Sequence, residues 1–194
     1  MVQDVQSAAY YALAGVVLMT VAGIDCGLDG GLVVISGPSF ALQLSLHVTP
    51  TLGVGRRAYD LQRMRELLCG HAIEHVWLER QQTIKSFGGR TQGAVQSFST
   101  GLGYGMWQGL LAGLQIPFDT VSPQVWQKSM FVGVTAGDTK AKSALVAQRL
   151  HPTVDWRRTT RCRSVHDGLA DAFCIAEYGR RSMAQRSAHG LVGT

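Results

Sequence analysis

Cysteine and histidine patterns that would mark a metal finger or a covalent nucleophile are missing from this sequence. The cysteines form no CxxC pair and no Cys/His ligand spacing, which excludes a zinc finger and a disulfide scaffold. His71 and His75 pair with no nucleophile in the sequence pattern, so covalent catalysis is not expected. We expect four free thiols in a reducing compartment, namely Cys26, Cys69, Cys162 and Cys174.

A long hydrophobic run is also missing. Residues 8–22 are almost wholly apolar, but the run is short for a membrane span, so no membrane partner is expected. The start has neither the basic region of a secretory signal nor the Arg/Ser-rich character of a transit peptide. We expect a lead-in over residues 1–15, one folded domain over 16–182, and a flexible tail over 183–194.

Internal repeats and low-complexity linkers are lacking, so the 194 residues suit one compact domain. A hydrophobic content of 46% with 16% charged residues is typical of a globular protein with a real core. The charge balance is basic, with 18 Lys+Arg against 13 Asp+Glu and a formal net charge of +5. This weakly favours an anionic partner such as nucleic acid.

The order of apolar runs and turn residues predicts a mixed α/β domain. Strands are expected up to residue 25 and over 32–35, 40–48, 76–78 and 117–121. Helices are expected over 56–68, 102–114, 123–130, 139–150 and 166–181. Three antiparallel strands followed by helix-linked parallel strands describe a ribonuclease H-like mixed five-stranded sheet flanked by helices.

Four carboxylates occupy positions that suit a metal site. Asp25 and Glu79 each end a predicted strand, where open α/β sheets place their active sites. Asp167 and Asp171 are four residues apart on one predicted helix and so share a face. Such oxygen donors suit Mg²⁺ or Mn²⁺, and two ions can activate a water and stabilise the leaving oxygen of a phosphodiester. Two plainer roles stay open: Asp25 as a turn cap and Asp167 as a helix cap.

Five segments resemble motifs of the RuvC-type Holliday junction resolvases, most closely the chloroplast resolvases and their phage relatives. They are GIDCGLDGG at 23–31, WLE at 77–79, FSTGLGYGMW at 98–107, VSPQVWQK at 121–128 and HDGLADA at 166–172. Cys26 stands where the family usually has proline, and His166 and Asp167 appear in swapped order. Of these two, we favour Asp167 as the metal ligand, because it is four residues from Asp171.

The resemblance implies a homodimer that resolves four-way DNA junctions by paired symmetric nicks. It further implies two Mg²⁺ or Mn²⁺ ions per active site, held by Asp25, Glu79, Asp167 and Asp171. Some sequence preference, around cytosines, and an organelle location, most closely the chloroplast, also follow from it, with a mitochondrial or phage source left open. Two alternatives are a non-catalytic junction-binding scaffold and a fragment of an actin-like kinase, since 25–31 also resembles a phosphate loop.

Basic, amide and aromatic residues around the expected cleft are candidates for DNA contact. The segment 80–100 mixes all three kinds, and its alternative role is that of a surface loop. The candidates are Arg80, Gln82, Lys85, Phe87, Arg90, Gln92, Tyr104, Lys128, Lys140 and Lys142, with His166 for proton handling. A basic run at Arg157, Arg158, Arg161 and Arg163 either follows a junction arm or forms a solvated loop, whereas Trp107 and Trp126 are expected in the core.

Overall fold

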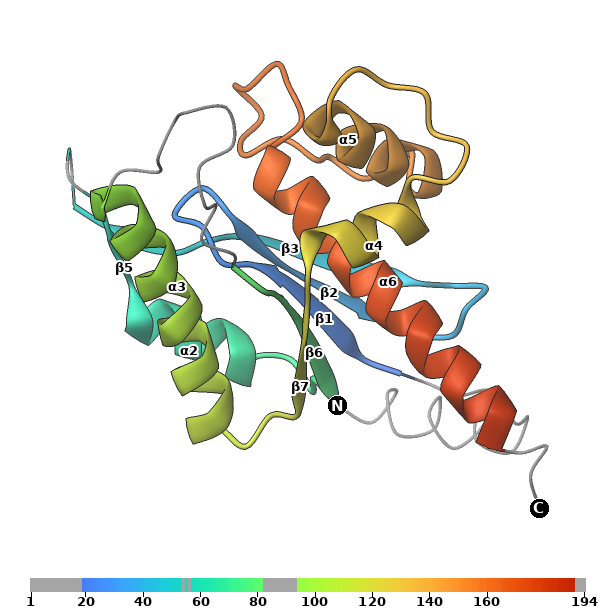
Figure 1. Cartoon of the computed structure of the whole chain (residues 1–194), viewed down its shortest axis with the longest axis horizontal. Helices are drawn as coiled ribbons and strands as arrows, with labels where there is room; N and C mark the ends of the chain where they lie inside the picture. Colours follow the sequence, from blue (N-terminus) through green and yellow to red (C-terminus); the bar gives the residue numbers. More distant parts are fainter. Residues whose placement is uncertain (1–18, 54, 56, 82–93, 191–194) are drawn as a thin grey trace.

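The computed structural model describes residues 19–53, 55, 57–81 and 94–190. Its centre is a five-stranded sheet with the order β3-β2-β1-β6-β7 (Figure 1). The antiparallel strands are β1 (Val21–Asp25), β2 (Gly31–Ser36) and β3 (Gln43–Val48). The strands β6 (His75–Glu79) and β7 (Phe118–Val121) run parallel to β1 and to each other. This is the ribonuclease H-like sheet that the sequence predicts.

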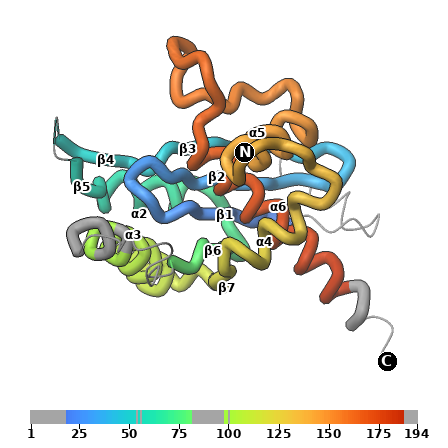
Figure 2. Tube along the Cα trace, turned by 45° about the horizontal axis from the view of Figure 1, so that its top comes forward, coloured from blue at the N-terminus to red at the C-terminus, as the bar shows by residue number. Residues whose placement is uncertain are grey.

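Helices cover both faces of the sheet (Figures 1 and 2). On one face lie α2 (Leu61–Cys69) and α3 (Ala94–Gly113), and on the other lie α4 (Pro123–Met130), α5 (Thr139–Leu150) and α6 (Asp167–Gly190). Because side chains alternate along a strand, each strand feeds two cores. In β1, Ala22 and Ile24 pack toward α2 and α3, whereas Val21 packs toward the α6 face. Asp25 therefore belongs to the α6 face as well.

Local capping explains why α2 and α5 begin where they do. Asp60 accepts a hydrogen bond from the Arg63 backbone N–H at 3.0 Å, and Asp138 accepts one from Ala141 at 2.8 Å. The helix predicted over 139–150 is confirmed, and so is the helix opened by Pro123. The helix predicted from residue 56 was wrong at its start. Its first residues form the strand β5 (Ala58–Tyr59), which pairs with β4 (Thr51–Leu52).

Two helices extend past their predicted ends. The helix α3 begins at Ala94, inside the segment expected to be a loop, and α6 continues to Gly190 through residues expected to be a tail. In α6, Glu177 accepts hydrogen bonds from Arg180 and Arg181 at 2.7 Å, three and four residues further on. Such pairs favour helix within an otherwise polar stretch. The third strand is shorter than predicted and leaves Phe40 outside it, 71% exposed.

Backbone contact between α6 and β1 depends on a glycine. A Cβ on Gly23 would overlap the Ala172 carbonyl oxygen and the Ala176 backbone nitrogen. The side chain that any other residue would carry there is thus excluded, and the two main chains touch. Trp107 and Trp126 are buried, as predicted, and all four cysteines are free. None of the helices in the described ranges combines the length and apolarity needed to cross a membrane.

Candidate functional site

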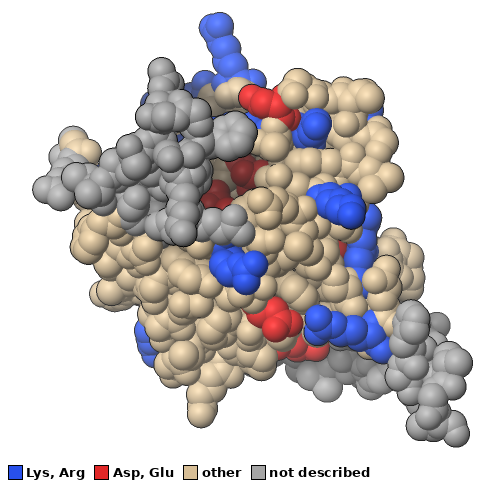
Figure 3. All heavy atoms as spheres, in the orientation of Figure 1, with Lys and Arg blue, Asp and Glu red and all other residues tan. Residues whose placement is uncertain are grey.

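Three carboxylates from distant parts of the chain meet on the α6 face of the sheet. The parallel register pairs Ile24 with Leu78, so Asp25 and Glu79 follow side by side at the ends of β1 and β6. Asp171 comes from the first turns of α6, whose backbone lies against β1. Asp25 and Asp171 each raise the pKa of the Glu79 carboxyl through charge repulsion, which places the three groups within electrostatic reach of one another. Figure 3 shows acidic side chains recessed in a hollow of the surface.

Burial is the main cause of the raised pKa values of these three carboxyl groups. Desolvation raises the pKa of Glu79 to about 8 and that of Asp171 to about 7, and repulsion from Asp25 adds to both shifts. The pKa of Asp25 is also raised by burial, although its Oδ1 accepts a hydrogen bond from the Gly27 N–H at 3.2 Å. Three desolvated carboxylates this close repel one another unless protons or cations separate them. The cluster is therefore a strong attractor for cations.

Glu79 is held in place by two side chains that donate to it. The Trp126 Nε1–H donates to Oε1 at 3.1 Å, and the Gln81 amide donates to Oε2 at 3.5 Å. Trp126 is only 1% exposed and packs edge-on against Phe131, with ring centroids 5.6 Å apart. The sequence prediction of Trp126 as a core residue is confirmed, but its contact with Glu79 was missed. The sequence did hold one indication that Trp126 belongs to the site, because the segment 121–128 resembles a resolvase motif.

Asp167 lies at the rim of the carboxylate cluster and is more exposed than its members. It is the first residue of α6, its side chain is 48% exposed, and it pairs with the Lys140 Nζ at 2.8 Å. Burial raises the pKa of both Asp25 and Asp171, and the charge of Lys140 opposes part of this rise. Of the predicted lysines, the structure thus brings Lys140 to the carboxylates. It places Asp167, the predicted fourth metal ligand, beside this lysine.

The remaining candidates for DNA contact are placed unevenly. Arg80 directly follows Glu79 and is exposed, and Lys128 is exposed in the last turn of α4. Lys142 is half-buried on α5, and Tyr104 packs partly buried against the core on the α3 face. His166 lines a cavity of about 310 Å³ together with Asp167, at the start of α6. Gln82, Lys85, Phe87, Arg90 and Gln92 lie outside the described residues.

The donor chemistry of the cluster fits a hard divalent cation. Across the described ranges, no group of three or more His, Cys, Asp or Glu side chains is arranged to hold a metal ion. Mg²⁺ does not require such a group, because it keeps several waters and binds through one or two carboxylates plus substrate phosphates. Asp25, Glu79 and Asp171 supply partly buried carboxylate oxygens of this kind. The residues present therefore fit a magnesium-type site completed by substrate.

No protein-family model and no curated protein matches this sequence. Solved structures match its fold. RuvC of T. thermophilus in complex with a Holliday junction substrate has a TM-score of 0.56 and 20% identity, covering 82% of this chain and 92% of that one. A second Thermus thermophilus RuvC structure has a TM-score of 0.54 and 22% identity, covering 84% and 96%. The yeast mitochondrial Holliday junction resolvase Ydc2 has a TM-score of 0.54 and 16% identity, covering 86% and 80%. The chain therefore shares the fold of these resolvases.

Proposed function

We propose that this protein is a divalent-metal-dependent endonuclease that cuts four-way DNA junctions by paired symmetric nicks. The observation that carries the proposal is the meeting of Asp25, Glu79 and Asp171, all partly buried and all with raised pKa, on this fold. Three mutually repelling carboxylates are stabilised when divalent cations lie between them. Cations held in this way suit phosphodiester hydrolysis, because they can activate a water and stabilise the leaving oxygen.

In this proposal each side chain has a distinct part. Asp25, Glu79 and Asp171 hold Mg²⁺ or Mn²⁺, and Asp167 adds a fourth oxygen donor at the rim. Two bound ions would supply an activated water and stabilise the leaving oxygen. Lys140, now paired with Asp167 at 2.8 Å, neutralises charge on the incoming phosphate. Trp126 fixes the Glu79 carboxylate through its hydrogen bond at 3.1 Å.

A homodimer is part of the proposal, because a junction with two-fold symmetry requires two equivalent active sites for paired nicks. The outer face of α3 supports it. A Cβ at Gly105, Gly109 or Gly113 would meet no atom within 4 Å, so this face is open for close helix packing. The exposed Arg80 and the segment that follows it are proposed to read sequence near the cut. A chloroplast location is proposed from the resemblance of the sequence motifs.

The test is cleavage of a synthetic four-way junction in the presence of Mg²⁺, with plain duplex of the same sequence alongside. Symmetric nicks in the junction and intact duplex are expected for the wild type. Asp25→Asn is expected to bind the junction without cutting it, whereas Asp119→Asn, a strand carboxylate outside the cluster, cuts normally. A mobility shift with no nicks in the wild type identifies a binding scaffold and rejects the proposal. Normal cleavage by Asp25→Asn rejects the metal assignment.

A further inference from the structure

We propose that Arg57 and Arg158 form a binding site for one backbone phosphate of the DNA strand, and that the Asp29 carboxylate holds this place until DNA arrives. The inference rests on the proposed function and adds to it a phosphate contact away from the buried carboxylates. It begins with Asp29, in the turn between β1 and β2. The Arg57 guanidinium donates two hydrogen bonds to it, each 2.8 Å long. Arg158 approaches the same carboxylate at 3.6 Å.

One carboxylate shared by two guanidinium groups leaves a positive charge unbalanced. The Asp29 side chain is 67% exposed, while Arg57 and Arg158 are 31% and 42% exposed, so the pair is open to solvent. A planar guanidinium binds phosphate with the same two-pronged geometry that it uses for a carboxylate. Exposed ion pairs contribute little net stability, so exchange of the carboxylate for a phosphate is easy.

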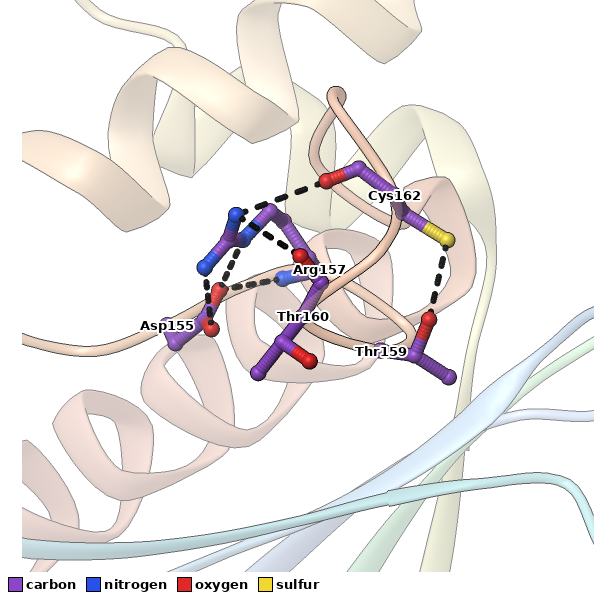
Figure 4. Close-up of polar contacts among 5 residues, drawn as sticks. All are labelled: Asp155, Arg157, Thr159, Thr160 and Cys162. Atoms are coloured by element: carbon purple, nitrogen blue, oxygen red, sulfur yellow. Dashed lines mark hydrogen bonds and ion pairs between the residues drawn. The ribbon is translucent and has the colours of Figure 1, made fainter.

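The loop that carries Arg158 is built to hold it still. Arg157 points back into its own loop and donates to both carboxylate oxygens of Asp155 at 2.8 Å (Figure 4). It also reaches the carbonyl oxygens of Thr160 at 3.4 Å and Cys162 at 3.5 Å. Arg157 therefore stabilises its own loop, whereas its neighbour Arg158 lines the cavity. An arginine with a fixed backbone loses less freedom when it binds a ligand.

The position of the pair relative to the active site suits a neighbouring phosphate. Arg158 and Asp29 line the 310 Å³ cavity together with His166 and Asp167. Asp167 pairs with Lys140, so the cavity links the rim of the carboxylate cluster to Arg158 and to Asp29, whose carboxylate Arg57 contacts at 2.8 Å. The Asp29 turn is fixed against α6, because a Cβ on Gly168 would overlap the Asp29 carbonyl oxygen. Because Asp167 and Arg158 line one cavity, we expect a strand with one phosphate at the cluster to bring a neighbouring phosphate to this pair.

The test measures junction binding by fluorescence anisotropy with the full chain, in EDTA to prevent cleavage, across a KCl series. Each phosphate contact contributes roughly 0.7 to 0.9 to the slope of log K against log salt. Arg158→Ala and Arg57→Ala are each expected to lower the slope by about that amount. The defect of each variant is then about 3-fold larger at 50 mM than at 200 mM salt. Arg149→Ala, an exposed arginine outside the cavity, is the matched control and leaves the slope unchanged.

Asp29→Asn separates phosphate binding from a purely structural latch. If the arginines bind phosphate, this variant binds junctions more tightly than the wild type, and Arg158→Lys retains most of the slope. If the cluster only ties the turn to the loop, Asp29→Asn and Arg57→Ala weaken binding alike with an unchanged slope, which overturns the inference. Failure of the wild type to bind junctions refutes the proposed function itself, whereas wild-type binding with unaltered variant slopes refutes only the phosphate site.

Discussion

Replacement of Glu79 by glutamine is expected to stabilise the metal-free protein while abolishing cleavage. The pKa of Glu79 is raised from 4.5 to about 8, chiefly by burial and then by the charge of Asp25. A carboxyl whose pKa is higher in the folded state than in the unfolded state costs no stability below its unfolded-state pKa, because it is protonated in both states there. As the pH rises from 4.5 to about 8, the unfolded chain loses this proton first, and stability falls.

The size of the effect follows from the two pKa values. One pH unit of difference corresponds to about 1.4 kcal/mol, so the native protein gives up roughly 3 kcal/mol at pH 7 and roughly 5 kcal/mol above pH 8. Glutamine stays neutral at every pH and keeps the shape of the side chain. Glu79→Gln is thus expected to raise the free energy of unfolding by up to these amounts, which corresponds to roughly 6–12 °C in melting temperature at pH 7. Near pH 4 the two proteins are expected to melt alike.

Thermal unfolding in EDTA at pH 4, 5, 6, 7 and 8, followed by circular dichroism, measures this difference. Glu66→Gln is the matched control, because Glu66 is an exposed helix residue with a lowered pKa, and no gain that grows with pH is expected from it. Addition of Mg²⁺ is expected to narrow the gap, since a cation offsets the repulsion in the wild type. A Glu79→Gln difference that does not change between pH 4 and pH 8, or a variant less stable than the wild type at pH 8, would refute the burial argument.

Three further substitutions test the surroundings of the cluster. Trp126→Phe keeps the packing but removes the donor to Glu79, so junction cleavage is expected to fall about ten-fold or more in single-turnover assays, and a rate within two-fold of the wild type would contradict the positioning role. Lys140→Ala removes an exposed ion pair, so the free energy of unfolding is expected to change by less than about 1 kcal/mol. Junction cleavage by this variant is expected to fall, and unchanged cleavage would exclude a contact of Lys140 with phosphate. Gly23→Ala forces α6 away from β1 and is expected to cost about 1–3 kcal/mol or more in denaturant unfolding; an unaltered midpoint would show that the helix shifts freely.

The sequence predicted those parts of the site that depend on local pattern. An apolar run that stops at a carboxylate located Asp25 and Glu79 at strand ends, and helical spacing located Asp171 on the helix that covers them. The starts of two helices followed from local pattern as well, because the cap Asp138 and the first-turn proline Pro123 are next to the residues that they affect.

What escaped prediction depends on partners far apart in the chain. Trp126 donates to Glu79 across 47 residues, and no local spacing indicates such a contact. The hydrogen bonds of Asp29 with Arg57 join residues 28 positions apart and were missed for the same reason. The strand β5 was taken for helix because the apolar pattern of α2 shows which face is buried but not where the helix begins. That start is set by Asp60.

The contact of α6 with β1 at Gly23 has a wider consequence. Because the two main chains touch there, the spacing between Asp25 and Asp171 is set by backbone against backbone and not by the choice of rotamers. The loops that join these elements can then be exchanged or lengthened while the distance between the two carboxylates stays the same. Under the proposed function, loops of this chain could change in DNA preference while the sheet and its covering helix keep the carboxylates in place.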